Sequence, residues 1–111
     1  MSDAVLAEEI SVSELKAMHD AGRAFVLLDV REYDELASAR IMWAKHVPMA
    51  SVADRLTELP RNGNIVVMCH AGVRSDRVAR YLRDVGFTSV ANLTGGIDAW
   101  SLEIDGRVAR Y

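Results

Sequence analysis

The residue best suited to chemistry in this 111-residue chain is Cys69, its single cysteine, in the segment CHAGVRS at positions 69–75. An apolar strand is expected before it and a helix after it. Loop N–H groups, the positive end of that helix and Arg74 would all favour a charged sulfur, and such effects lower a cysteine pKa from ~8.5 to roughly 3.5–7.5. Cys69 is therefore a candidate thiolate nucleophile. The alternative is a small buried hydrophobic residue, which is how most lone free cysteines behave.

Several other polar residues lie near Cys69 or near the expected strand ends. Arg74 would stand at the start of a helix, where a cation opposes the helix dipole. That mismatch favours a dedicated role for Arg74, either in anion binding or in a structural ion pair. His70 is interpreted as an exposed loop residue, because nothing in the sequence orients it as a base. Asp29 and Arg31 are interpreted as structural residues that hold neighbouring loops together, since structural ion pairs often resemble functional ones.

Composition limits the class of protein. A net charge of −3 argues against a nucleic-acid-binding surface, and no apolar run approaches the ~18 residues of a membrane span. The N-terminal segment lacks a basic stretch followed by a long apolar one, so no signal peptide is evident. A single cysteine excludes an internal disulfide and a C-x-x-C motif, and the three histidines show no metal-ligand spacing. We therefore expect one domain over residues 1–111, in the cytoplasm, with no cofactor and no metal.

Capping residues, apolar runs and turn residues mark the expected elements. Ser11 and Glu14 form a capping box that begins a helix, and Gly22 ends it. The apolar runs at 25–28 and 65–68 are typical of strands that are buried on both faces. The remaining elements are a short helix at 32–38, a weaker strand at 44–47, a helix capped by Ser51 and closed by Pro60, a helix over about 75–85, a strand around Val90 and a last short helix carrying Ile97 and Trp100.

Strands that alternate with helices predict an α/β fold with a mainly parallel sheet and helices on both faces. In such sheets, ligands bind beyond the carboxyl ends of the strands. Cys69 and Asp29 both follow apolar strands and are expected at such ends. Gly95 and Gly96 are interpreted as a turn, because the spacing of a phosphate-binding loop is lacking.

Four motifs along the chain resemble those of the rhodanese family. The cysteine loop fits the pattern C-x-x-G-x-[RS]-[ST], with Cys69, Gly72, Arg74 and Ser75 at its fixed positions. The other three motifs are LLDVR at 27–31, which resembles an early strand ending in D-V-R, VGF at 85–87, which resembles G-[FY], and LTGGIDAW at 93–100, which resembles L-x-G-G-x-x-A-W. The resemblance implies the rhodanese-like fold, a central mainly parallel sheet flanked by helices on both faces.

The resemblance also implies sulfur transfer. The thiolate of Cys69 would attack the outer sulfur of a donor such as thiosulfate, sulfite would leave, and a persulfide would remain on Cys69. Cyanide or a thiol would then remove that sulfur, and a protein acceptor is an open alternative. Loop N–H groups would stabilise the thiolate and then the persulfide anion. The substrate-binding residues implied in this way are His70, Ala71, Gly72, Val73, Arg74 and Ser75.

One segment departs from the family pattern. Rhodaneses usually carry G-H-I-x-G-A before a strand and a proline, whereas this chain has ARIMWA at 39–44. Trp43 therefore places a large ring where a glycine is typical. Local repacking is the favoured interpretation, because tryptophan normally finds a buried position. The alternative is that Trp43 docks a partner or gates a substrate.

Three rival functions stay open. Cysteine phosphatases and arsenate reductases of related fold need a C-x-x-x-x-x-R loop, one residue longer than the spacing from Cys69 to Arg74. Non-catalytic regulatory modules commonly lose the cysteine, which this chain retains. A persulfide carrier that serves a partner protein would keep the same chemistry. Because the chain has no second cysteine, the sulfur acceptor must come from outside in each sulfur-transfer model.

Overall fold

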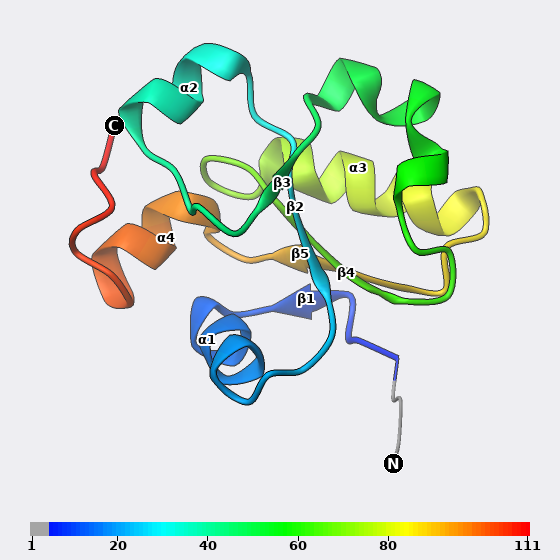
Figure 1. Cartoon of the computed structure of the whole chain (residues 1–111), viewed down its shortest axis with the longest axis horizontal. Coiled ribbons are helices and arrows are strands. Elements are labelled where there is room, and N and C mark those ends of the chain that lie inside the picture. Colours follow the sequence, from blue (N-terminus) through cyan, green and yellow to red (C-terminus); the bar gives the residue numbers. More distant parts are fainter. Residues whose placement is uncertain (1–4) are drawn as a thin grey trace.

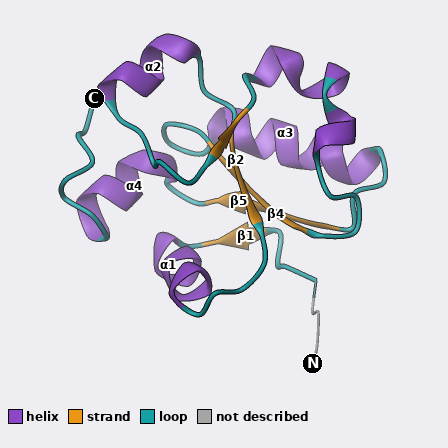
Figure 2. Cartoon of the chain, viewed as in Figure 1, coloured by secondary structure: helices purple, strands orange, loops and turns teal. Residues whose placement is uncertain are grey.

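The computed structural model describes residues 5–111 and contains a five-stranded, fully parallel sheet (Figures 1 and 2). The strand order is β1-β5-β4-β2-β3, so β4 is the central strand. The strands are β1 (Glu9–Ile10), β2 (Val26–Asp29), β3 (Lys45–His46), β4 (Asn64–Met68) and β5 (Ser89–Leu93). The helices are α1 (Val12–Asp20), α2 (Tyr33–Ser38), α3 (Val73–Asp84) and α4 (Gly96–Glu103), with 3-10 helices η1 (Met49–Asp54) and η2 (Leu56–Glu58).

Helices cover both faces of the sheet, which confirms the predicted fold class (Figure 1). Successive strand residues point to opposite faces, so each apolar run supplies both cores. Leu27 and Val66 pack in one core with residues of α1 and α4. Leu28 and Val67 pack in the other with residues of α3 and η1. Burial on both faces is the reason that these strands are continuously apolar.

Several element boundaries agree with the sequence. Ser11 caps α1 with the full capping box, and its side chain accepts a hydrogen bond from the amide of Glu14. The weaker strand expected at 44–47 is β3, which pairs in parallel with β2. The short helix expected at 32–38 is α2, which begins one residue later, at Tyr33.

Two expectations need correction, and one strand was not predicted. The helix expected after Ser51 consists of η1 and η2, and it begins at Met49 after Pro48, with the Ser51 amide bonded to the Pro48 carbonyl at 2.8 Å. α3 begins at Val73 rather than Ser75, because Gly72 takes a left-handed φ of 110° and forms the N-cap. β1 was not expected. It is only two residues long, and it pairs with the distant β5.

Within residues 5–111, no helix is long and apolar enough to cross a membrane. The predicted cytoplasmic location remains a prediction.

Candidate functional site

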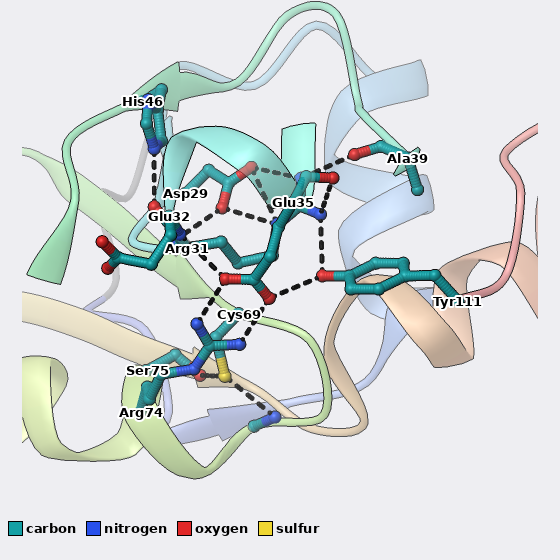
Figure 3. Close-up of polar contacts among 11 residues, drawn as sticks. Asp29, Arg31, Glu32, Glu35, Ala39, His46, Cys69, Arg74, Ser75 and Tyr111 are labelled. Atoms are coloured by element: carbon teal, nitrogen blue, oxygen red, sulfur yellow. Dashed lines mark hydrogen bonds and ion pairs between the residues drawn. The ribbon is translucent and has the colours of Figure 1, made fainter. Parts of the chain in front are cut away.

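Cys69 directly follows the central strand β4 and lies at the carboxyl edge of the sheet. This is the position that the sequence predicted for a ligand-binding residue in a parallel sheet. The side chain is almost fully enclosed, and the residue is 1% exposed. Residues 70–72 form a short turn, and α3 then begins at Val73. The sulfur is therefore held between the end of a strand and the first turn of a helix (Figure 3).

The sulfur of Cys69 is surrounded by hydrogen-bond donors. The amide of Gly72 donates to Sγ at 3.1 Å, and the hydroxyl of Ser75 lies 3.2 Å from it. Burial alone raises the pKa of the Cys69 thiol, but the hydroxyl of Ser75 and the amides of Ser75, Gly72 and Ala71 together outweigh that effect. The pKa of the thiol therefore lies below its ordinary value. Such a site favours a thiolate, the reactive form of cysteine.

The Gly95-Gly96 turn holds the cysteine loop from the opposite side. At the start of α4, the amide of Ile97 donates to the carbonyl of Cys69 at 2.9 Å, and the amide of Asp98 donates to the carbonyl of His70 at 3.0 Å. A Cβ at Gly96 would overlap both carbonyl oxygens, and its φ is +59°. The glycine pair thus forms a turn, as expected, and it also fixes the backbone of the cysteine loop.

Arg74 forms an ion pair rather than standing alone at the helix start. Its guanidinium donates to both carboxylate oxygens of Glu35 on α2, at 2.6 and 2.8 Å. The Arg74 guanidinium lowers the pKa of Glu35 to about 2, and Glu35 in turn raises the pKa of Arg74. Of the two roles that the sequence left open for Arg74, the structure contains the ion pair. Binding of an anionic substrate by Arg74 remains a prediction.

Asp29 and Arg31 form a buried pair next to α2. The Arg31 guanidinium donates to both oxygens of Asp29, and the two residues are 0% and 1% exposed, respectively. Arg31 also donates to the carbonyl of Ala39 at 2.9 Å and to the hydroxyl of Tyr111 at 2.9 Å. These contacts tie β2 to the segment after α2 and to the end of the chain, so both residues have a structural role here.

His70 differs from the expected exposed loop residue. Its ring stacks on Tyr111 with centroids 4.2 Å apart, and the residue is half-buried. Tyr111 also donates its hydroxyl to Glu35 at 2.9 Å, so its ring and its hydroxyl link the cysteine loop to α2. No local sequence pattern indicates this contact, because His70 and Tyr111 are far apart along the chain.

The remaining predicted loop residues differ in accessibility. Ala71 and Val73 are exposed, Gly72 is half-buried, and Ser75 is completely buried beside the sulfur. Ser75 also contacts Asn92 on β5, a residue that the sequence analysis did not single out. A sequence signal was available, since Asn92 is a polar residue between the apolar residues Ala91 and Leu93, and β5 is buried along its whole length.

Trp43 packs against aromatic side chains of the α1–α4 face. Its ring stacks on His19 at 4.0 Å and contacts Phe25 and Trp100 edge-on at 5.9 and 6.0 Å. These contacts support local repacking, although Trp43 keeps 39% exposure. Among the residues that the structure describes, no group of three or more His, Cys, Asp or Glu side chains could hold a metal ion.

Comparison with known proteins places this geometry in a family. A model of the rhodanese-like domain matches residues 11–103. A candidate sulfurtransferase of Bacillus subtilis is 36% identical over 96 residues, which cover 86% of this chain and 92% of that protein. A candidate sulfur carrier protein of the same organism is 37% identical over 93 residues, covering 84% of this chain but only 50% of that longer protein.

A solved structure shows the same fold. The crystal structure of a rhodanese-like domain protein from Staphylococcus aureus superposes with a TM-score of 0.79 at 33% sequence identity, covering 85% of this chain and 91% of that one. The relatives and the fold together support sulfur transfer as the general activity.

Proposed function

Since the chain belongs to the rhodanese-like domain family, we propose that it is a sulfurtransferase that moves sulfane sulfur from a small-molecule donor to a thiophilic acceptor through a persulfide on Cys69. The observation that carries this proposal is the enclosed sulfur of Cys69, which has the Gly72 amide at 3.1 Å and the Ser75 hydroxyl at 3.2 Å. These donors favour the thiolate that sulfur transfer requires.

The proposed reaction has two steps, in which the same sulfur atom is first bound to Cys69 and then passed to the acceptor. In the first, the Cys69 thiolate attacks the outer sulfur of thiosulfate, the sulfur–sulfur bond of the donor breaks, and sulfite leaves with the bonding electron pair. A Cys69 persulfide anion remains, close to the loop amides. In the second step, cyanide or a thiolate attacks the outer sulfur of the persulfide. The new sulfur–sulfur bond breaks, thiocyanate or a new persulfide leaves, and the Cys69 thiolate is regenerated.

A persulfide carrier that serves a protein acceptor is the second candidate. The chain has one cysteine, so it cannot discharge its own persulfide as an internal disulfide. One relative is also a candidate sulfur carrier. The carrier would use the same first step and would differ only in the molecule that receives the sulfur. A phosphatase is disfavoured because the loop is short and the Arg74 guanidinium is already bound to Glu35.

The proposal is tested by intact-protein mass spectrometry. Incubation with thiosulfate should add the mass of one sulfur atom, and cyanide should remove it with release of thiocyanate. Cys69→Ser should show neither change, because a hydroxyl cannot hold a transferable sulfur. Ser101→Ala, on α4 and bonded to the Ala109 carbonyl, is a control that should retain both. Full activity in Cys69→Ser would contradict the proposal.

The same mass-spectrometric measurement distinguishes the possible sulfur donors and the possible sulfur acceptors. Sulfur loading by glutathione persulfide but not by thiosulfate would move the donor class from thiosulfate to persulfides. Efficient loading followed by slow transfer to cyanide and to small thiols would favour the carrier. Both outcomes keep Cys69 as the sulfur-bearing residue, and failure to load from either donor would contradict sulfur transfer by this chain.

A further inference from the structure

Ser75 has two hydrogen-bond partners but only one hydroxyl proton. Its Oγ lies 3.2 Å from Cys69 Sγ and 2.6 Å from Asn92 Oδ1 on β5. Ser75 is 0% exposed and Asn92 is 4% exposed, so water does not readily replace either contact. A hydroxyl donates a single hydrogen bond. The acceptor that receives this proton therefore decides how much Ser75 stabilises a thiolate on Cys69.

The orientation of the Asn92 amide follows from its other neighbours. Its Nδ2 lies 3.1 Å from the carbonyl oxygen of Gly72 and 3.2 Å from Oε1 of Glu9 on β1. A carbonyl and a carboxylate accept hydrogen bonds and donate none, so the amino end of Asn92 must face them. Its oxygen then faces Ser75. Because that oxygen carries no proton, the Ser75 hydroxyl must be the donor whenever the 2.6 Å contact is made, and it donates to Cys69 Sγ only when that contact weakens.

We propose that Asn92 is a positioning residue for Cys69: its side-chain oxygen draws the Ser75 hydroxyl proton away from the sulfur and thereby limits the fraction of thiolate. In the thiol form, the S–H of Cys69 donates to a free lone pair of Ser75, and the Ser75 hydroxyl donates to Asn92. In the thiolate form, the sulfur competes with Asn92 for that one proton, while the Gly72 amide remains bound to the sulfur. The inference rests on the proposed role of Cys69 as nucleophile, but it concerns only the acidity of the thiol.

Charged groups around the site do not explain the competition for this proton. Within residues 5–111, the hydrogen-bond partners of Ser75 Oγ are Cys69 and Asn92. The surrounding charged and titratable groups are Glu9 on β1, Asp29 and Arg31 at and just after the end of β2, Glu35 on α2, His70 in the loop, Arg74 on α3, Asp98 on α4 and Tyr111 after α4. Neutral replacements of Asn92 and Ser75 leave these charges in place. Replacing Asn92 also removes its contacts with Gly72 and Glu9, so the same replacement must be made with and without Ser75 to isolate the hydrogen bond between Ser75 and Asn92.

A double-mutant cycle tests the proposal. The variants are Asn92→Val, Ser75→Ala and the combination, and the readout is the pH midpoint of Cys69 alkylation by iodoacetamide. Valine removes the acceptor and is well tolerated in a strand. Asn92→Val should lower the midpoint by about one pH unit, the size of one hydrogen bond to a charged group. In the Ser75→Ala background, the same substitution should produce no such fall, because the proton in question is gone.

The chain offers a matched control for the asparagine. Asn64 on β4 accepts a hydrogen bond from the Ser89 hydroxyl at 2.7 Å, at the opposite end of the sheet from Cys69. Asn64→Val removes the same kind of Ser–Asn contact and should leave the alkylation midpoint unchanged. Circular dichroism of each variant checks that it is folded before alkylation is measured.

A measurement on the wild-type protein covers the case in which Asn92→Val does not fold. During a pH titration followed by NMR, the side-chain amide signals of Asn92 should shift with the Cys69 midpoint, because thiolate formation weakens the contact between Ser75 and Asn92. The signals of Asn64 should not follow that midpoint. Stationary Asn92 signals would overturn the proposal. So would an unchanged or raised midpoint in Asn92→Val, or a fall that persists in the double variant. Failure of sulfur loading in the wild type would contradict the proposed function. It would not affect the alkylation midpoints or the NMR shifts that test the role of Asn92.

Discussion

Arg74 and Glu35 join α3 to α2 beside the cysteine loop through two parallel hydrogen bonds of 2.6 and 2.8 Å (Figure 3). The planar guanidinium fits the carboxylate in the two-bond geometry that arginine favours and that lysine cannot reproduce. The Tyr111 hydroxyl donates to the same carboxylate. The cation that the sequence places at a helix start is thereby balanced by a partner from another element.

Glu35→Gln should weaken the fold by breaking this pair. We expect the free energy of unfolding at neutral pH to fall by about 1–2 kcal/mol, because two hydrogen bonds between charged groups are lost at a partly exposed position. Urea denaturation measures the change. Asp20→Asn, which breaks the more exposed pair with Lys16 on α1, is the control and should change stability much less. Equal losses in the two variants would contradict a special role for the Arg74–Glu35 pair.

The same pair predicts a pH dependence of stability. The pKa of Glu35 is lowered to about 2 in the folded protein, against ~4.3 in an unfolded chain. A lowered folded-state pKa stabilises the fold above the unfolded value, and the contribution is lost as the pH falls from about 4 through about 2. Glu35→Gln should therefore show a shallower loss of stability over this interval than the wild type. If the stability of the wild type and of Glu35→Gln fell in parallel over this pH interval, the pKa of Glu35 would not be lowered in the folded protein.

The thiol of Cys69 should be more acidic than that of a model cysteine. Hydrogen bonds from the Ser75 hydroxyl and the loop amides outweigh burial and lower its pKa. Alkylation by iodoacetamide in the folded protein should have a pH midpoint below ~8.5, the pKa of an unperturbed cysteine, and unfolding in urea should return the midpoint to that value. A midpoint at or above ~8.5 in the folded state would identify Cys69 as an ordinary thiol.

Gly96→Ala should distort the cysteine loop, although the substitution lies outside that loop. The new methyl group would overlap the carbonyls of Cys69 and His70, and the φ of +59° is unfavourable for alanine. We expect a loss of about 2–4 kcal/mol in stability from overpacking and backbone strain, and a higher alkylation midpoint because the loop must move. Gly106→Ala has open space around it and is the matched control. Equal stability and equal alkylation midpoints in the two variants would contradict the proposal that the Gly95-Gly96 turn holds the backbone of the cysteine loop.

Local patterns predicted the central strands and the position of Cys69 at the end of one of them. The apolar runs became β2 and β4 because each is buried on both faces, and the loop after β4 needs a glycine because Gly72 has a φ of 110°. The two-residue strand β1 could not be predicted from its own residues, because pairing with β5 creates it. The segment after Pro48 has helix-like spacing of apolar residues, yet it forms 3-10 helices that share a core with α3.

The partners of the site residues were not predictable in the same way. Glu35 lies 39 residues from Arg74 along the chain, Asn92 lies 17 residues from Ser75, and Tyr111 lies 76 residues from Glu35. Each contact joins different elements, so it depends on strand order rather than on local spacing. The sequence indicates that Arg74 needs a negatively charged partner, but only the folded structure shows that this partner is Glu35.

Arg74→Ala tests whether Arg74 also recognises the sulfur donor. If its charge attracts an anionic donor, kcat/KM for thiosulfate should fall about ten- to a hundredfold, the effect of about 1.5–3 kcal/mol for a contact with a charged group. Arg74→Lys should recover only part of this loss, because an ammonium lacks the planar fork. Rates are compared under conditions in which every variant is fully folded.

Glu35→Gln separates substrate recognition from the structural ion pair. This variant retains the positive charge of Arg74 but removes the carboxylate that neutralises it, so recognition of thiosulfate should be kept or improved even though stability falls. If Arg74 acts only through the ion pair, Glu35→Gln and Arg74→Ala should lose activity together. Neither variant should hydrolyse an aryl phosphate, because the loop from Cys69 to Arg74 is one residue shorter than a phosphatase loop. Phosphatase turnover that rivals sulfur transfer in the wild type would contradict the proposed reaction.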